Sequence, residues 1–492
     1  MSSSQHLRRT SRANIQIINR DIEDNDSSTS EPLLPSDKQS KESEGSASIG
    51  SCTFSYQPIY LLTSMQASLI WLIRMLAMPD VLSSTGIIPG MILILFCAFM
   101  SSFGLYLLSL CSDKLPPRSA SFNAIAKITY PTAAMYFDLA IALKCFGVSI
   151  SYLLILGQLV PPLVTSFFHH LTPSQVDPPS WLLSRHFWIT VFVILLSPLA
   201  SMRQLNSLRH TSYVSIFSAG YLLLIVVLCA VHSPIPLPPA GNVSLGRFDA
   251  SAISKFPVLV FAFTCAQNFF PVKNELRSNT RSRTTTVIGS SIGVASGLYE
   301  IIGVLGYVTF GDNVNSNVMS MYPETKMTSD TSIFISFGRL AIVILVLSSY
   351  PLQVHPCRNS LDKVIRTKSE KEKALASQDE DSEDDEIIKH PPSKTKHTIL
   401  TISILLLTWA VSMVVTQLDK VLAFVGSTGS TIISFILPGL FYRALTLNDD
   451  EPSRKWLRVG SRLLIFYGAS VMIFCLAFNF YELFTNSTST FV

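Results

Sequence analysis

The sequence FAFTCAQNFFPVKNEL, residues 261–276, begins as an apolar membrane-spanning segment and ends in polar and charged residues. Gln267, Asn268 and Pro271 stand where a membrane helix is expected to continue. In lipid every backbone amide needs a partner, so a non-helical chain is tolerated only where it is buried in protein or lines a cavity. Some membrane proteins interrupt two corresponding helices of an inverted repeat in this way and bind a solute there. We therefore expect a helix break between Ala266 and Pro271, matched by a break five spans earlier near Met75.

The composition of the whole chain agrees with a membrane protein. Of the 492 residues, 48% are hydrophobic and 14% are charged, whereas about a quarter are charged in a soluble protein. The apolar residues gather in runs of about twenty, the length that crosses a lipid bilayer as a helix. These runs predict eleven spans near 59–84, 87–111, 132–160, 186–201, 210–231, 256–272, 284–309, 331–352, 397–417, 421–443 and 462–485.

Lysine and arginine are distributed unequally between the two sides of the predicted membrane. The loops on the side of the N-terminus hold 29 of them, and the loops on the other side hold five. Such an excess is typical of the cytosolic side, so we expect a cytosolic N-terminus. The basic residues are spread over several short loops, so the net charge of +4 predicts no nucleic-acid partner.

The composition also predicts the regions outside the membrane. Residues 1–54 are rich in Ser, Asp, Glu and Lys and are expected to be a disordered cytosolic tail. Residues 55–485 form the transmembrane domain, in which 358–396 is expected to be a disordered, acidic cytosolic loop, and 486–492 a short lumenal tail. The sequence has no metal-ligand spacing, nucleophile elbow or phosphate loop, so we expect no metal, no cofactor and no enzymatic activity.

Five segments carry a resemblance to a known family. They are MLAMPDVLSSTGIIPG (75–90), KCFGVSISYLLILGQLVP (144–161), FAFTCAQN...NEL (261–276), GYVTFGDNVNSNVM (306–319) and FVGSTGSTIISFILPGLFY (424–442). In this order and at these spacings they resemble the amino acid/auxin permease family, within it the fungal vacuolar amino acid transporters and the animal sodium-coupled neutral amino acid transporters. The resemblance covers nearly all of 55–485.

The resemblance implies an all-α polytopic protein with a LeuT-type fold. Spans one to five and six to ten would form two inverted halves, with the eleventh span appended. It also implies an amino acid substrate held between the broken first and sixth spans, with coupling to protons more often than to sodium. On this basis we expect the substrate-binding residues to be Met75, Leu76, Ala77, Thr264, Cys265, Ala266, Gln267 and Asn268.

Few ionisable or polar side chains within the spans are candidates for ion coupling. Glu300 in the seventh span and Lys144 in the third lie deep in the membrane. Placing an ionisable side chain there costs free energy, which suggests either a function or a pairing of the two residues. Ser348 and Ser349 lie near the place where the sodium-coupled relatives have a threonine that helps to bind the sodium ion. The alternative is that both serine hydroxyls donate to carbonyl groups of their own helix. We take Glu300, Ser348 and Ser349 as candidates for ion or proton coupling.

The chain departs from the family pattern at both breaks. Ile73 and Arg74 replace part of a Gly-Ala-Gly turn in the first span. Three interpretations follow: Arg74 pairs with the substrate carboxylate, Arg74 blocks the site, or residues 55–74 come from a misassembled gene model. In addition, Ala266 stands where the family usually has a histidine that can carry a proton, and Gln158 stands where the fungal branch commonly has an aspartate.

The leading hypothesis is a secondary active amino acid transporter of the vacuolar membrane, coupled to protons rather than sodium. The tail sequence EPLLP (31–35) resembles the acidic dileucine signals that sort vacuolar and lysosomal proteins. The plasma membrane is the alternative location. A non-transporting amino acid sensor with the same fold is the alternative function, because the altered first break suits binding without turnover.

Overall fold

The computed structural model describes most of the membrane domain. The described residues are 74–116, 118–171, 178–202, 211–231, 239–247, 249, 251–276, 280–322, 330–376, 394–447 and 455–488. Within them, eight helical segments are long and apolar enough to cross a membrane, and two shorter apolar helices lie at Arg185–Ser201 and Phe217–Val231. An all-α polytopic membrane protein is therefore confirmed. The predicted tail at 1–54 and the predicted first span before Arg74 lie outside the described residues.

The helices of the two halves follow one another in the predicted order. The first half contains the 3₁₀ turn η1 (Met75–Ala77), α3 (Met78–Thr85), α4 (Ile87–Ser112), α5 (Phe122–Thr129), η2 (Pro131–Ala133), α6 (Ala134–Leu171), α7 (Arg185–Ser201) and α8 (Thr211–Val231). The second half contains α9 (Ser251–Ala262), α10 (Ala266–Glu275), α11 (Arg281–Phe310), η4 (Gly311–Asn313), η5 (Val318–Ser320), α12 (Asp330–Ala376), α13 (Lys394–Val414), α14 (Leu418–Val425), the π-helical turns η6 (Gly426–Ser430) and η7 (Ile432–Ile436), and α15 (Leu437–Leu445). The last helix is α16 (Lys455–Thr488).

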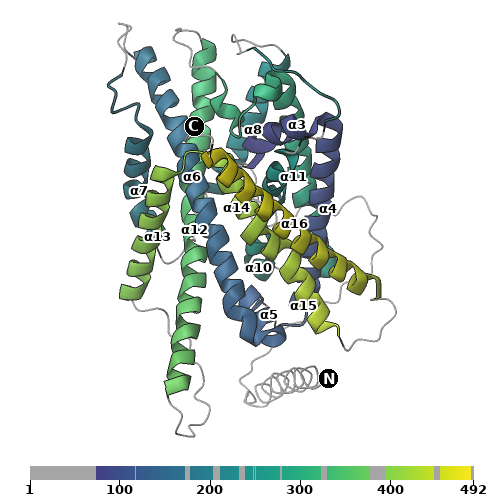
Figure 1. Cartoon of the computed structure of the whole chain (residues 1–492). Helices are drawn as coiled ribbons and strands as arrows, with labels where there is room; N and C mark the ends of the chain where they lie inside the picture. The colour runs from purple at the N-terminus through teal and green to yellow at the C-terminus, as the bar shows by residue number, and fades with distance from the viewer. Residues whose placement is uncertain are drawn as a thin grey trace, which may run out of the picture.

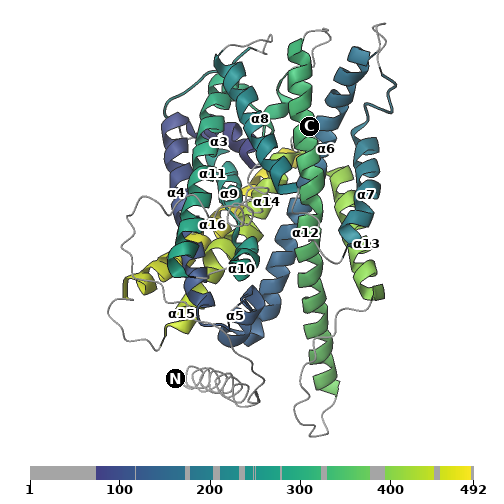
Figure 2. The same ribbon diagram turned by 180° about the vertical axis from the view of Figure 1, so that it is seen from behind.

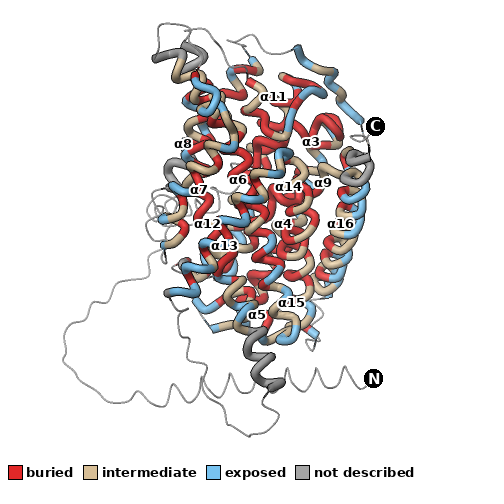
Figure 3. The backbone as a smooth tube through the Cα atoms, turned by 60° about the vertical axis from the view of Figure 1, so that its left-hand side comes forward, coloured by how far each residue is buried: buried red, intermediate tan, exposed pale blue. Residues whose placement is uncertain are grey.

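The helices pack as a bundle around α6 and α12, which share the most extensive interface of the protein. On one side α7 and α13 lie next to each other, and on the other side α4 packs against α11 (Figures 1 and 2). Helix α16 runs obliquely across α14 and α15 (Figure 1). Buried residues concentrate on the inner helices, while α16 carries many exposed positions (Figure 3). The exposed residues of α16 include Leu463, Phe466 and Phe474, as expected for a lipid-facing helix.

The sixth predicted span is interrupted, but not where its polar residues suggested. Helix α9 ends at Ala262 and α10 begins at Ala266, so the interruption is Phe263–Cys265 and ends two residues before Gln267. Gln267 and Asn268 belong to the first turn of α10, and Pro271 lies inside that helix. The prediction of a break between Ala266 and Pro271 was therefore wrong. Side chains of other helices bind the freed carbonyl groups before Ala266, and these contacts decide the position of the break.

Helix α12 continues beyond the end predicted for the eighth span. It passes through Pro351 and Pro356 and reaches Ala376, so the predicted disordered loop at 358–396 begins too early. Arg358 stabilises this extension, because its Nη1 donates to the Ala200 carbonyl oxygen at 2.9 Å and to Thr401 Oγ1 at 3.0 Å. The acidic run of the loop lies outside the described residues.

The last helix is also longer than its predicted span. Helix α16 begins at Lys455, before the predicted start at 462, and extends to Thr488. The short lumenal tail predicted at 486–492 therefore begins within this helix. Hydropathy detects only the apolar part of a helix that lies in the hydrocarbon core of the membrane. The polar ends of the helix, which extend beyond this core, are not detected.

Gly426 in η6 lets the tenth span approach α9 closely. A Cβ atom at this position would lie 2.0 Å from the Pro257 carbonyl oxygen of α9. Glycine is needed where two backbones come this close, because it has no side chain to intervene.

Replacing Gly426 with alanine is expected to destabilise the protein, because η6 and α9 must move apart at a cost of about 1–3 kcal/mol. Gly293→Ala in α11 is the matched control, since nothing lies within 4 Å of its added methyl group. Melting temperatures of the two purified variants in detergent measure the difference. Equal melting temperatures would contradict the importance of this contact.

Candidate binding site at the two interrupted helices

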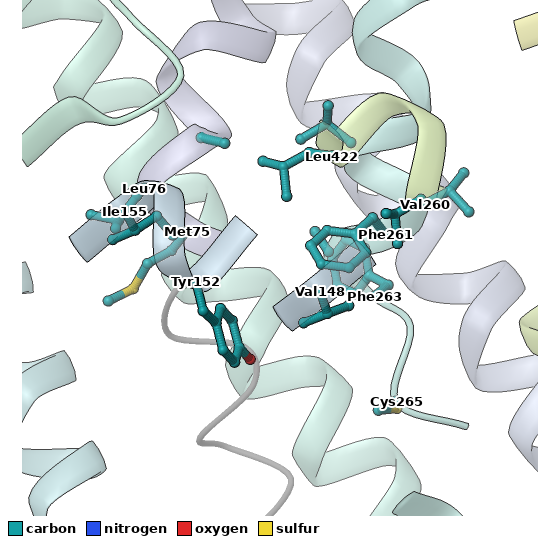
Figure 4. Close-up of a cluster of buried hydrophobic side chains, with 14 of the residues drawn as sticks. Met75, Leu76, Val148, Tyr152, Ile155, Val260, Phe261, Phe263, Cys265 and Leu422 are labelled. Atoms are coloured by element: carbon teal, nitrogen blue, oxygen red, sulfur yellow. The ribbon is translucent and has the colours of Figure 1, made fainter. Parts of the chain in front are cut away.

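The two interruptions lie against each other in the middle of the bundle. The 3₁₀ turn η1 replaces regular α-helix at Met75–Ala77, and residues Phe263–Cys265 separate α9 from α10. Figure 4 shows Met75 and Leu76 in one buried cluster with Phe261, Phe263 and Cys265, beside Val148, Tyr152 and Ile155 of α6. The structure thus brings together the two segments that the sequence predicted to form a site.

Arg74 joins the two interruptions directly. Its Nη1 atom donates to the carbonyl oxygens of Phe261 at 2.5 Å, Ala262 at 3.1 Å and Thr264 at 2.7 Å. Its guanidinium group also lies 4.1 Å from the centre of the Phe261 ring. The last carbonyl groups of a helix have no partner within the helix, and a cation is favourable at that end. Arg74 therefore caps α9 from the first span.

Other helices supply the remaining donors at this interruption. Ser101 of α4 donates to the Phe263 carbonyl oxygen at 2.7 Å, and Tyr299 of α11 donates to that of Ala262 at 3.1 Å. The Thr264 hydroxyl bonds back to the Val260 carbonyl oxygen at 2.8 Å. The backbone acceptors at 260–264 are thus bound by side chains from four parts of the chain, which stabilises the non-helical segment within the membrane.

Two glutamines extend the site toward α12. Gln267 Nε2 donates to Gln353 Oε1 at 3.2 Å, and Gln353 is completely buried. Sequence reasoning named Gln267 but missed Gln353, for which the only signal was an amide inside an apolar span. It also missed Tyr152 on α6, which faces the same region (Figure 4). Ala266 is buried at the start of α10.

Asn268 has a different environment from its neighbour Gln267. Together with Cys265 it lines an apolar crevice between α10 and α11. The eight residues predicted to bind substrate therefore lie at or beside the two helix interruptions. They do not all face one cavity, because Asn268 faces the crevice beside α11 and Gln267 faces α12.

The candidates for ion coupling lie apart from the two interruptions. Ser348 donates to the Ile344 carbonyl oxygen at 2.9 Å and Ser349 to that of Leu345 at 2.8 Å, so both bond back to α12. Glu300 is half-buried on α11, and its Oε1 atom is buried without a hydrogen-bond partner among the described residues. The alternative that Glu300 pairs with Lys144 was wrong, since neither makes that contact. The coupling role of Glu300, Ser348 and Ser349 stays a prediction.

The two ends of the bundle differ in access to the interruptions. At the α5 end, a cavity of about 310 Å³ is lined by Gln267 of the site, by Asp138 and Asn274, and by exposed Lys363. It therefore leads from the surface to the first turn of α10.

At the opposite end, charged contacts hold the elements together. Lys255 Nζ lies 2.7 Å from Asp80 Oδ1 and binds α9 to α3. Arg247 pairs with Asp249 at 2.6 Å and with Asp312 at 2.8 Å. In this conformation the cavity at the α5 end reaches Gln267, which follows the sixth-span interruption by two residues.

Comparisons with known proteins agree with this architecture. The family model described as transmembrane amino acid transporter protein matches residues 59–480. The chain belongs to this family, amino acid/auxin permeases. The resemblance drawn from the five segments is confirmed. The match includes residues 59–74, which one interpretation had assigned to a misassembled gene model.

Individual relatives cover most of the chain. Vacuolar amino acid transporter 5 of Schizosaccharomyces pombe is 38% identical over 83% of this chain and 91% of its own length. Vacuolar amino acid transporter 6 of Saccharomyces cerevisiae is 33% identical over 82% of this chain and 94% of its own length. Sodium-coupled neutral amino acid transporter 7 of Xenopus laevis is 24% identical over 75% of this chain and 77% of its own length.

A solved structure supports the fold. The crystal structure of MhsT in complex with L-phenylalanine superposes with a TM-score of 0.52 at 14% identity, over 86% of this chain and 99% of MhsT. The LeuT-type fold predicted for this family member is therefore confirmed.

Arg74→Met is expected to destabilise the permease strongly. The Thr264 carbonyl oxygen loses its donor, and a buried, unpaired acceptor costs about 1–3 kcal/mol. The carbonyl oxygens of Phe261 and Ala262 each lose one of two donors. Arg247→Met is the matched control, because the Arg247 side chain is 42% exposed and its ion pairs are accessible to water. Thermal unfolding in detergent should show a much larger loss for Arg74→Met. Similar melting temperatures for both variants would show that Arg74 does not cap α9.

Proposed function

We propose that this family member is a secondary active amino acid transporter of the vacuolar membrane, coupled to protons. The observation that carries the proposal is the meeting of η1 with the Phe263–Cys265 interruption in the centre of the bundle. Broken helices at such a position bring helix ends to the middle of the membrane, where they can bind a zwitterion. The printed names of the fungal relatives, which match most of this chain, support an amino acid as the substrate and the vacuole as the location.

Transport requires that the site open to each side of the membrane in turn. The unequal distribution of Lys and Arg predicts that the α5 end faces the cytosol. In this proposal the cavity lined by Gln267 and Lys363 is the cytosolic path, and the Lys255–Asp80 contact belongs to the closed lumenal side. The conformation described here would then be open to the cytosol.

Protons are proposed as the coupling ion in preference to sodium. Glu300 offers a carboxylate within a membrane helix, with one oxygen buried and without a partner among the described residues. The Ser348 and Ser349 hydroxyls donate to carbonyl groups of their own helix, which does not favour a sodium site there. A transporter is favoured over a sensor, because the fungal relatives are described as transporters.

Uptake of labelled amino acids into vacuolar vesicles tests the proposed function. Vesicles containing the protein should accumulate at least one amino acid when ATP is present, and a protonophore should abolish this accumulation. Gln353→Leu should lower uptake about tenfold, since it removes a buried polar partner of Gln267 and 1.4 kcal/mol corresponds to a factor of ten. Gln417→Leu, at an exposed position before α14, is the matched control. The absence of uptake and of efflux from preloaded vesicles would contradict the proposed function.

Glu300→Gln tests proton coupling separately from substrate binding. The amide cannot exchange a proton, so gradient-driven accumulation should fall about tenfold or more, while exchange of labelled for unlabelled amino acid continues. Thr309→Ala, in the same helix, controls for substitution in α11. Accumulation by Glu300→Gln equal to that of the unmodified protein would exclude Glu300 as the coupling group.

A further inference from the structure

The cavity at the α5 end has the size of a binding site. Its volume is about 310 Å³, and pockets for small ligands begin at about 300 Å³. Asn274 of α10 fixes one wall, because its Oδ1 atom accepts from the Ala120 amide at 3.2 Å and its Nδ2 atom donates to the Ala120 carbonyl oxygen at 2.8 Å. These two bonds join α10 to the segment before α5 and hold the wall in place.

Two opposite charges line this cavity from two helices. Among the described lining residues, Asp138 of α6 and Lys363 of α12 are the ones with a formal charge. Lys363 Nζ lies 4.0 Å from Asp138 Oδ1, which is longer than a direct hydrogen bond. The other carboxylate oxygen, Oδ2, accepts from Asn123 Nδ2 at 2.8 Å. The cavity therefore presents a carboxylate oxygen and an ammonium group side by side.

The two charged side chains differ in their exposure to water. The Lys363 side chain is 46% exposed, whereas the Asp138 side chain is 6% exposed. Burial disfavours the charged form of a carboxyl group, and nearby cations and hydrogen-bond donors favour it. For Asp138 these favourable groups are Lys363, Asn123 and Lys127. A ligand cation beside Oδ1 would stabilise the Asp138 carboxylate further.

Apolar side chains lie on the wall of the same cavity. Phe122, Ile141 and Phe270 line it, and the two phenyl rings are 4.8 Å apart in an edge-to-face arrangement. Apolar walls with a few polar groups are typical of small-molecule sites, in which the polar groups fix the orientation of the ligand. The cavity also reaches Gln267 in the first turn of α10. A ligand bound here would therefore lie on the way to the interruptions.

We propose that this cavity is a second binding site for amino acids, in which Asp138 binds the α-ammonium group and Lys363 binds the α-carboxylate group. The inference rests on the proposed function and adds a site on its cytosolic side. Both charged groups of an amino acid are attached to one carbon atom, so they lie side by side like the two side chains. A ligand with only a carboxylate meets the like charge of Asp138, and one with only an ammonium group meets that of Lys363. The pair therefore selects zwitterions.

A cysteine placed in the cavity reports whether the site is occupied. Asn359 lines the cavity and is exposed, while the cysteines of the described residues are buried. The purified Asn359→Cys protein is labelled with N-ethylmaleimide, and labelling of the unmodified protein is subtracted. Leucine at about 10 mM, a concentration suited to weak binding, should slow the labelling at least about threefold. 3-Methylbutylamine and 4-methylpentanoate, which each lack one of the two charges, should slow it less than about 1.5-fold.

Further substitutions in the Asn359→Cys protein assign the protection to the charged pair. Lys363→Met should abolish protection by leucine and Lys363→Arg should retain it, because only the second substitution keeps the charge. Lys396→Met, which removes an exposed lysine of α13, is the matched control and should retain protection. Gln353→Leu alters the site at the interruptions but not the lining of the cavity, so protection should persist.

The possible results separate this second site from the proposed function. Labelling that leucine does not slow, equal protection by the amine or the acid, or protection that survives Lys363→Met would overturn the second site. Loss of protection in Gln353→Leu would overturn it too, because the protection would then come from binding at the interruptions. Amino acid uptake into vesicles without such protection leaves the proposed function standing. The absence of both uptake and efflux contradicts the proposed function itself.

Discussion

The structure depends on the capping of α9 by the guanidinium group of Arg74. A membrane helix that stops in the middle of the bundle leaves carbonyl groups without partners, and water is not available there to bind them. Three of these groups, those of Phe261, Ala262 and Thr264, accept from Arg74. Tyr299 of α11 also donates to that of Ala262, and Ser101 of α4 donates to that of Phe263. The interruption is thus a joint product of the first, second, sixth and seventh spans. Any movement of α9 relative to η1 has to replace these bonds.

The packing around the interruption follows from this constraint. Residues of α6 lie beside both interruptions (Figure 4), and Gly426 and Gly429 let the tenth span approach α9 and α6 closely. Gly426 lies against the Pro257 backbone and Gly429 against Lys144 and the Ala140 carbonyl oxygen. A side chain at either position would push the tenth span away from its neighbour.

The two ends of the bundle have different roles in this arrangement. The charged contacts of Lys255 and Arg247 join α3, α9 and the segment before η5 at one end. At the other end the cavity lined by Asp138 and Asn274 stays open to Gln267. In the proposed transport cycle these contacts have to break on one side as the cavity closes on the other. The half-helices α3 and α10 lie on opposite sides of the interruptions, so each is positioned to move with one end.

The sequence by itself determined the environment, the family and most helices. Hydropathy measures the transfer of a segment into lipid, and this local property predicted α4 and α11 within a few residues of Ile87–Ser112 and Arg281–Phe310. It failed where partners distant in the sequence decide the outcome. The sixth-span break lies at Phe263–Cys265, before the polar residues that suggested it, because Arg74, Ser101 and Tyr299 supply donors there. Helix α12 passes through Pro351 and Pro356 and continues to Ala376, and in this extension Arg358 binds Ala200 and Thr401 of other helices. The partners of the buried charges were likewise decided only by the tertiary structure, since no local pattern predicts that Arg74 binds backbone carbonyl groups of the sixth span or that Lys144 makes no contact with Glu300.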